Sequence, residues 1–414
     1  MMIREDAQTI IKEAIKTNLP DKAVEVALGQ RELKGNVYLL AIGKAAWVMA
    51  KAASDSLGNK VKKGIVITKY NHSQGEIPNM EIIEAGHPIS DENTISGTEK
   101  ALAMVEKLTA KDEILFLVSG GGSALFESPQ QGITLADLVD MNHQLLASGA
   151  NIVEINMIRK RLSKVKAGRF AELCKPANIF AIVLSDVIGD RLDSIASGPA
   201  VPDNSTREDA MKVVNKYQLK LTEAALRCLQ KETPKEVSNV ETVITGSVRT
   251  LCDSAAKTAK ALGYRPVILS TTLECEASQA GAVIGTMAHE IGQSEDSLKP
   301  PCAVIVGGET VVYLKGNGKG GRNTEMALKV ATLIDGLDKV VFFSLGSDGT
   351  DGPTDAAGGI VDGQTMKRLR EKGMEAEAFL ANNDSYNALK EVDGLIMTGP
   401  TGTNVNDVSV LLCK

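Results

Sequence analysis

The strongest constraint on the fold is a series of short, continuously apolar segments that recurs along the whole chain. Strands buried on both faces read in this way, whereas a half-exposed strand alternates apolar and polar residues. Helical patterns separate these segments, for example at 45–58 and 94–108. The alternation predicts an α/β protein with a doubly wound parallel sheet. The predicted strands lie at 37–43, 64–69, 113–120, 178–186, 265–271, 302–308, 339–348 and 394–399.

The length of 414 residues suggests two or three domains. The most favourable boundary is the polar segment 231–240, which carries Pro234 and follows a helical pattern. We therefore predict a first domain at 1–235 and a second domain at 236–414.

Composition excludes several classes of function. The net charge of −6 and the aromatic content of 3% do not fit the basic footprint of a nucleic-acid-binding protein. No apolar run approaches the roughly 20 residues that span a bilayer. The first ten residues, MMIREDAQTI, include acids and lack the apolar core of a secretory signal. We expect a cytoplasmic protein that binds neither nucleic acid nor membrane.

A triple glycine follows one of the predicted strands. In LVSGGGSALF the strand ends in Ser119, Gly120, Gly121, Gly122 and Ser123. Consecutive glycines let backbone N–H groups turn toward an anion and approach it closely. The loop is not a phosphate-binding P-loop, since the GK(S/T) ending is missing. The alternative interpretation is a flexible turn without a ligand.

Two cations stand at similar places. Lys44 follows the strand of AIGKAAW at a predicted helix start, where it would neutralise an anionic substrate, although a surface lysine would read the same. Arg322 closes the basic loop of LKGNGKGGRNTEMAL and can fork onto a carboxylate or phosphate. The same loop matches GxGxxG at 316–321, which weakly indicates a dinucleotide site.

Acidic and polar loops follow other strands. Asp186 and Asp190, in SDVIGDRLD, suit a magnesium site or a general base, and single acids of this kind also cap helices. Asp351 lies in the acidic loop at 344–362, and Asn404 in the Gly/Thr/Asn loop at 398–407. The basic stretch at 158–170 most simply predicts a solvated helix face. The alternative is that one or two of its residues contact an anionic ligand.

Together these motifs resemble the class II glycerate kinases, which combine an N-terminal glycerate kinase domain with a C-terminal MOFRL domain. The resemblance covers residue 40 to the C-terminus, in family order. The matching pieces are AIGKAA, GHPISDENT, FLVSGGGSALFESP, IRKRLSKVKAGRFA, SDVIGDRLDSIASGPAVPD, GGETVVYL, GKGGRNTEMAL, GSDGTDGPTDAAGGIVD and NDSYNALK with GLIMTGPTGTNVND.

This resemblance implies ATP-dependent phosphorylation of D-glycerate with Mg²⁺, typically giving 2-phosphoglycerate. It implies a Rossmann-like domain at 1–235, a smaller α/β MOFRL domain at 236–414 and an active site in the cleft between them. It also implies that Lys44 and Arg322 stabilise charge during catalysis. The resulting enzyme is expected to be a monomer or homodimer whose partners are ATP and D-glycerate.

The site hypothesis adds Asp186 to Lys44 and Arg322 as a catalytic residue. Asp186 and Asp190 are the candidate metal ligands. The residues expected to bind substrate or phosphate are Ser119, Gly120, Gly121, Gly122, Ser123, Asp190, Asp351 and Asn404.

Two other functions remain open from the sequence. An NAD(P)-dependent oxidoreductase acting on hydroxypyruvate or a related hydroxy acid would use the GxGxxG match at 316–321. No clear ribose-binding acid follows it at the expected distance of about 20 residues. A non-catalytic sugar-phosphate sensor would explain the glycine loop but not the paired cations or the acids at 348–362.

Overall fold

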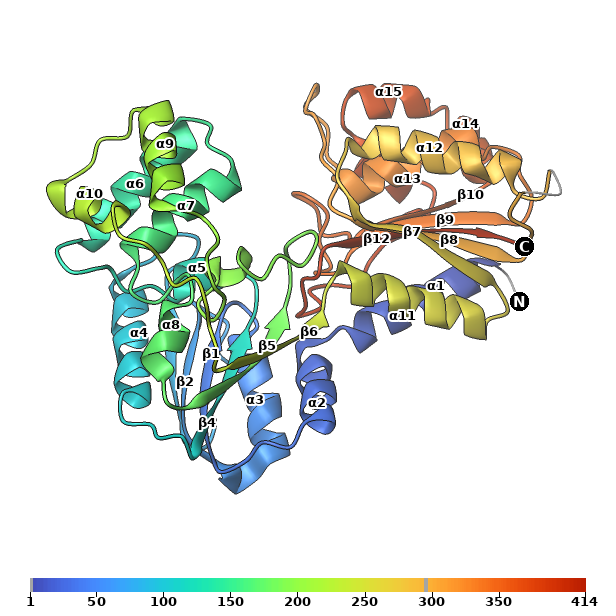
Figure 1. Ribbon diagram of the computed structural model, residues 1–414. Coiled ribbons are helices and arrows are strands. Elements are labelled where there is room, and N and C mark those ends of the chain that lie inside the picture. Colours follow the sequence, from blue (N-terminus) through green and yellow to red (C-terminus); the bar gives the residue numbers. More distant parts are fainter. Residues whose placement is uncertain (1–2, 294–296) are drawn as a thin grey trace. The chain divides into compact units, whose positions relative to one another are not determined.

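The computed structural model describes residues 3–293 and 297–414, and it divides into two compact units (Figure 1). The N-terminal unit is Pro20–Thr245. The C-terminal unit combines Gly246–Lys414 with the residues up to Leu19. This division differs from the predicted boundary at 235/236, because residues 236–245 complete the first sheet and the first helix joins the second unit.

Helix α1 (Ile3–Thr17) packs on α11 (Val248–Ala261) of the C-terminal unit. The Asp6 carboxylate accepts hydrogen bonds from the Tyr264 hydroxyl at 2.7 Å and from Lys414 Nζ at 3.0 Å. The amphipathic pattern of α1 shows that one side of the helix is buried, but it does not show which unit the helix packs against.

The sheet of the N-terminal unit has the strand order β3-β2-β1-β4-β5-β6. The neighbouring strands from β3 through β5 pair in parallel. This is the doubly wound Rossmann order, so the predicted fold class is confirmed. The strands are β1 (Asn36–Ile42), β2 (Val61–Lys69), β3 (Met80–Ala85), β4 (Asp112–Val118), β5 (Asn178–Leu184) and β6 (Val240–Gly246).

Helices cover this sheet and close an aliphatic core around three phenylalanines. Phe116 of β4 and Phe170 have ring centroids 5.0 Å apart, and Phe126 meets Phe170 edge to face. The flanking helices are α2 (Pro20–Gln30), α3 (Ala46–Leu57), α4 (Glu92–Val105), α5 (Gly122–Leu125) and α8 (Arg169–Cys174), with short 3-10 turns η1 (Gly58–Lys60) and η2 (Ile195–Ser197).

Four further helices of this unit form a helical subdomain with its own small apolar core (Figure 1). They are α6 (Leu135–Ala147), α7 (Ile152–Leu162), α9 (Arg207–Tyr217) and α10 (Glu223–Leu229). The basic stretch at 158–170 begins here, and the predicted solvated face is wrong. Lys160, Arg161 and Lys166 are at most 4% exposed, because internal carboxylates and carbonyls pair with their charges.

The sheet of the C-terminal unit has the order β11-β10-β9-β12-β8-β7 and is mixed. Only β7 and β8 run parallel, and the other neighbours are antiparallel. The parallel expectation was therefore wrong here, because an apolar run reports burial on both faces and not strand direction. The strands are β7 (Arg265–Leu273), β8 (Cys302–Gly308), β9 (Val340–Gly346), β10 (Gly358–Asp362), β11 (Leu395–Ile396) and β12 (Asp407–Cys413).

Helices lie on both faces of this second sheet (Figure 1). Helices α1 and α11 cover one face, and α12 (Ala277–Glu290) and α13 (Arg322–Leu333) cover the other. The remaining helices are α14 (Thr365–Glu371), α15 (Ala376–Ala381) and α16 (Ser385–Lys390). The smaller α/β second domain is thus confirmed.

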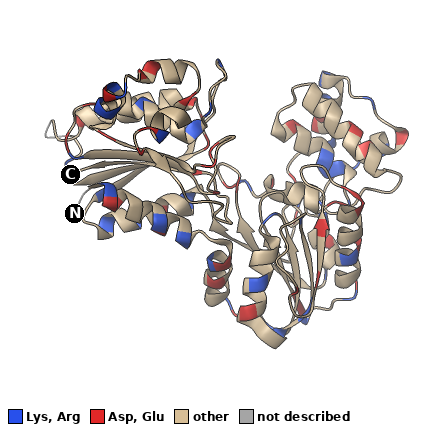
Figure 2. Ribbon diagram, turned by 180° about the vertical axis from the view of Figure 1, so that it is seen from behind, with Lys and Arg blue, Asp and Glu red and all other residues tan. Residues whose placement is uncertain are grey.

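Charged residues of both signs are interspersed along the helices, while the strands are largely uncharged (Figure 2). Among residues 3–293 and 297–414, no helix has both the length and the apolar character needed to cross a membrane.

Candidate functional site

The first candidate site lies where β1 and β4 end side by side. Strand order reverses between these two strands, and ligands of doubly wound sheets bind at such a point. The Ser119 N–H donates to Ile42 O at 3.0 Å, and the Lys44 N–H donates to Gly120 O at 2.9 Å. The Ala45 N–H donates to Ser119 Oγ at 3.1 Å. These bonds fix Lys44 against residues 119–123, which we call the glycine loop.

The glycines of this loop are required by close neighbours. A Cβ at Gly120 would collide with the Asp186 carboxylate, which follows β5. A Cβ at Gly121 would lie 3.0 Å from the His87 ring and 3.3 Å from Lys44 Cγ, and Gly121 has a φ of +87°. The structure therefore brings Lys44, the glycine loop, Asp186 and His87 together, and we call this group the Lys44 site.

His87 was not identified from the sequence as a site residue. Burial is the main cause that lowers the pKa of its imidazole, and the charges of Lys44, Lys69 and His72 lower it further. The ring is therefore neutral near pH 7 and can exchange hydrogen bonds with a ligand of the glycine loop. His87 follows β3, a half-exposed strand whose sequence is not continuously apolar, so the strand end that marks it was missed.

The outer part of the glycine loop contacts the segment that follows Asp186. Ser123 Oγ lies 3.0 Å from Ser197 Oγ, and Ser197 Oγ donates to Asn156 Oδ1 at 3.2 Å. Asp190 sits in a turn of the same segment, with a φ of +52° and its N–H donating to Val187 O at 3.0 Å.

Within residues 3–293 and 297–414, no group of three or more His, Cys, Asp or Glu side chains is arranged to hold a metal ion. Mg²⁺ usually binds through one or two carboxylates and takes its other ligands from phosphate and water. The acids present fit that mode and not an all-protein metal cage.

The second candidate site surrounds Arg322, the first residue of α13. Its Nε and Nη2 donate to the two carboxylate oxygens of Asp407, at 2.5 and 2.9 Å, and Nη1 lies 3.2 Å from Glu309 Oε1. Burial alone would lower the pKa of the guanidinium, but Asp407 and Glu309 raise it overall. Asp407 and Glu309 were not identified from the sequence. We call Arg322, Asp407 and Glu309 the Arg322 site.

Asp351 holds the start of the helix that carries Arg322. Its buried carboxylate accepts the N–H groups of Asn323 and Thr324 at 2.9 and 2.8 Å, together with the Thr324 hydroxyl at 2.8 Å. In this structure Asp351 therefore holds the first residues of α13 in place. Asn404 lies in the loop before β12, where its exposed side chain accepts the Asn406 N–H at 3.4 Å. The structure therefore brings Arg322 and Asp351 together, and Asn404 precedes Asp407 by three residues.

The glycines at 316–321 serve internal packing. A Cβ at Gly316 or Gly318 would collide with Asn382, and one at Gly321 would collide with Asp351. Strand β8 ends at Gly308 and α13 begins only at Arg322. This long loop does not form the tight strand-to-helix turn that a dinucleotide fingerprint requires.

Any activity that depends on Arg322 should fall in acid, because its partner Asp407 takes up a proton. Burial raises the pKa of Asp407 to about 6, although Arg322 opposes that rise. Below about pH 6 the neutral carboxyl loses its charge-assisted hold on the guanidinium. We expect kcat to decline as the pH falls through 6, and Asp407→Asn to have a lower plateau without that acid limb. A profile of kcat between pH 5 and 8 measures both, and an unchanged limb in the variant contradicts the assignment.

Stability separates this effect from acid unfolding. The folded pKa of about 6 exceeds the ordinary value of 3.8, so the folded state binds more protons between those values. The contribution of Asp407 to stability therefore grows as the pH falls from 6 toward 4, and is smallest above pH 6. Thermal unfolding midpoints over the same range provide the control.

Comparison with known proteins shows similarity over nearly the whole chain. Residues 6–230 match a family described as a domain of unknown function, DUF4147, and residues 302–407 match the MOFRL family. A Thermotoga maritima protein named D-glycerate 2-kinase is 53% identical over 401 residues, which are 97% of this chain and 96% of that protein. An Agrobacterium vitis protein named putative hydroxypyruvate reductase is 39% identical over 91% of this chain and 99% of its own.

A solved structure agrees with the fold described above. The crystal structure of a glycerate kinase from Thermotoga maritima superposes with a TM-score of 0.96 at 52% sequence identity, covering 99% of each chain. Similarity of this extent covers both units.

Proposed function

The chain belongs to the class II glycerate kinases, and on that premise we propose that it transfers the terminal phosphoryl group of ATP to the 2-hydroxyl of D-glycerate. The products are ADP and 2-phosphoglycerate. The observation that carries the proposal is the Lys44 site, where a lysine is fixed by backbone hydrogen bonds beside three glycines at the switch point of a doubly wound sheet. Such a place suits an anionic ligand.

Phosphoryl transfer needs positioning and neutralisation of oxygen charge more than covalent chemistry from the protein. We assign Lys44 and Arg322 to neutralisation of phosphoryl charge. The N–H groups of Gly120 and Gly121 bind an anionic group, whereas the Gly122 N–H donates to Ser119 O at 3.3 Å within the loop. Ser119 and Ser123 lie at the two ends of the loop. Asp186, against Gly120, accepts the proton of the substrate hydroxyl.

Mg²⁺ would neutralise phosphate oxygens of ATP when it is bound. Asp186 and Asp190 are the carboxylates proposed to hold it. Asp351 and Asn404 are proposed to act on the substrate through the Arg322 site, Asp351 by keeping the start of α13 in place. We further propose a cytoplasmic enzyme, monomeric or homodimeric, whose binding partners are small molecules.

An oxidoreductase is the second candidate, favoured by the name of the Agrobacterium vitis relative. The loop at 316–321 argues against an oxidoreductase. Asn382 and Asp351 pack directly against its glycines, in the space that a dinucleotide phosphate would need. A non-catalytic sensor is the third candidate. It does not explain why Asp407 and Glu309 fix the Arg322 guanidinium in one orientation, at distances of 2.5–3.2 Å.

The proposal is tested by incubating the protein with ATP and Mg²⁺, with and without D-glycerate, and measuring the ADP that forms. We expect ADP formation that depends on D-glycerate. No nicotinamide absorbance change is expected with NADH and hydroxypyruvate in the absence of ATP. Oxidation of NADH under those conditions would favour the reductase, and binding of glycerate without ADP release would favour the sensor.

A further inference from the structure

Lys166 is a fully buried lysine whose three N–H donors are all used. Its Nζ donates to Ser123 O and to Phe126 O, each at 2.8 Å, and lies 3.1 Å from Glu127 Oε2. The side chain has 0% exposure. An ammonium group has three donors and no acceptor, so this one is satisfied entirely by the last residue of the glycine loop, Ser123, and by Phe126 and Glu127 just after the loop.

A second cation and a serine complete the set of contacts. Arg159 of α7 donates from Nη2 to Ser123 O at 3.2 Å, and Ser90 Oγ donates to Ala124 O at 2.7 Å. Helix α5 has only four residues, so these carbonyls lack the partners that a longer helix would supply. Side chains from distant segments therefore bind the carbonyls of Ser123, Ala124 and Phe126.

The charges beneath the loop do not cancel. Two cations, Arg159 and Lys166, face one carboxylate, Glu127, which is 4% exposed. Glu127 Oε1 is buried and has no hydrogen-bond partner among the described residues. Burial lowers the pKa of Lys166, the charge of Arg159 lowers it further, and Glu127 raises it.

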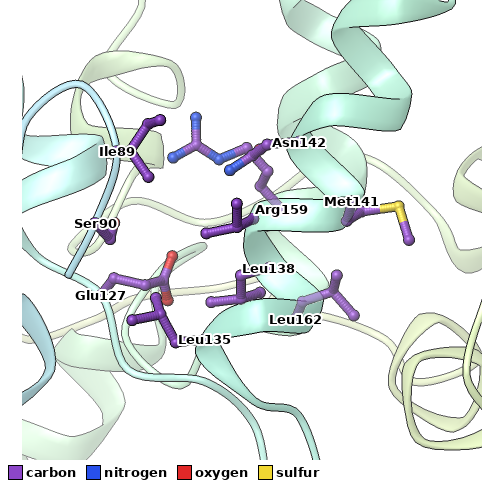
Figure 3. A pocket seen from close by; sticks show the side chains of 10 residues that line it. Ile89, Ser90, Glu127, Leu135, Leu138, Met141, Asn142, Arg159 and Leu162 are labelled. Carbon is purple, nitrogen blue, oxygen red and sulfur yellow. The ribbon is translucent and has the colours of Figure 1, made fainter. Parts of the chain in front are cut away.

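Figure 3 shows the surroundings of Arg159 and Glu127. The two residues line a cavity of about 20 Å³ together with the apolar side chains Leu135, Leu138 and Leu162. That volume holds about one water molecule, so it is not a ligand site. The apolar lining keeps the charges out of bulk water and strengthens their interaction with the loop carbonyls.

We propose that Lys166 and Arg159 are positioning residues for phosphoryl transfer. Both donate to the Ser123 carbonyl, an arrangement that we call the clamp, and so keep the glycine loop in the conformation that binds its anionic ligand. A loop that presents its N–H groups to an anion must turn its carbonyls elsewhere, and buried carbonyls need donors. The two cations supply those donors. The inference rests on the proposed function, since it assigns the clamp to the same glycine loop.

The consequence of removing Lys166 follows from these contacts. Ser123 O would keep the Arg159 donor, Phe126 O would lose the Lys166 donor, and Glu127 would lose its ion pair with Lys166. The backbone of the glycine loop would then take up a different position relative to the bound anion. A displacement of about 1 Å in a positioning group costs on the order of 10²-fold in rate.

Lys166→Met in the full chain, compared with Lys160→Met, tests the clamp. Lys160 is a matched control, because it comes from the same stretch, is 4% exposed and pairs with Asp203 and Asp193 at 3.5 Å without contacting the glycine loop. We expect Lys166→Met to lower kcat/KM by about 10²-fold, and Lys160→Met to change it by less than about 3-fold. Equal loss in the two variants would overturn the proposal.

The double variant Lys166→Met/Glu127→Gln separates positioning from folding. It removes the unpaired carboxylate, so we expect its thermal unfolding midpoint to recover toward that of the wild type while kcat/KM stays low. Recovery of both quantities would overturn the positioning role.

Titrations with ADP and, separately, with D-glycerate make the test independent of turnover. We expect at least one of these ligands to bind about 10-fold more weakly to Lys166→Met and normally to Lys160→Met. Unchanged affinity for both would overturn the clamp. A wild type that binds these ligands but forms no ADP would overturn the proposed function, and the titrations would still decide on the clamp.

Discussion

Lys44→Met is expected to lower kcat by 10²–10³-fold, on the order of the loss that follows removal of one charge-stabilising donor. Methionine keeps the aliphatic chain that lies 3.3 Å from the Cβ position of Gly121 but removes the ammonium group. The backbone bond from the Lys44 N–H to Gly120 O does not depend on the side chain. The glycine loop should therefore keep its form, and steady-state kinetics at saturating ATP and D-glycerate measures the charge alone.

Lys51→Met is the control for this change. Lys51 lies on α3, the helix that follows Lys44, and pairs with Asp55 on the surface. An exposed pair at this helical spacing is worth only about 0.3–0.5 kcal/mol. We expect normal kcat for Lys51→Met and unchanged unfolding temperatures for both variants. Turnover of Lys44→Met within about 3-fold of the wild type would remove Lys44 from the mechanism.

Arg322→Lys is expected to lose activity although it keeps the positive charge. The guanidinium bridges both oxygens of Asp407 and reaches Glu309 at the same time. An ammonium group is a point charge without that planar fork, so it cannot keep this geometry and face a phosphoryl group as well. We expect kcat of Arg322→Lys to fall on the order of 10²-fold or more. It should be only slightly higher than the kcat of Arg322→Met, which has no charge at this position.

Arg368→Lys tests whether any Arg–Asp pair of this unit would show the same loss. Arg368 pairs with Asp362 at 2.9 Å, at the end of β10. This pair contacts none of the residues of the Arg322 site, so we expect normal kcat. Equal loss from Arg368→Lys and Arg322→Lys would mean that the effect reports stability of the unit and not charge stabilisation in catalysis.

The proximity of Lys44, the glycine loop and Asp186 could be expected from the sequence more readily than the contacts of the Arg322 site. Continuously apolar strands mark their own ends, and in a parallel sheet these ends share one edge. Lys44, the glycine loop and Asp186 each follow such a strand, so their proximity could be expected. His87 was missed because β3 is half exposed and does not have that pattern.

The Arg322 site was less accessible to sequence reasoning. Its partner Asp407 was assigned to the end of the polar loop at 398–407. In the structure it begins β12, a central strand that was not among the predicted strands. Strand direction is set by chain connection and not by side-chain pattern, so the antiparallel pairing around β12 could not be predicted. The buried cations at 158–170 were also misread, because their partners, such as Asp203 and Glu127, lie far away in the sequence.

Phosphorus NMR of the product tests the central claim most directly. The protein is incubated with ATP, Mg²⁺ and D-glycerate, and the proton-coupled spectrum of the new phosphate monoester is recorded. A phosphate on the 2-oxygen couples to a single carbon-bound proton and gives a doublet, which is the predicted result. A triplet would place the phosphate on the 3-oxygen and contradict the assigned product, and the absence of any new monoester would contradict the kinase itself.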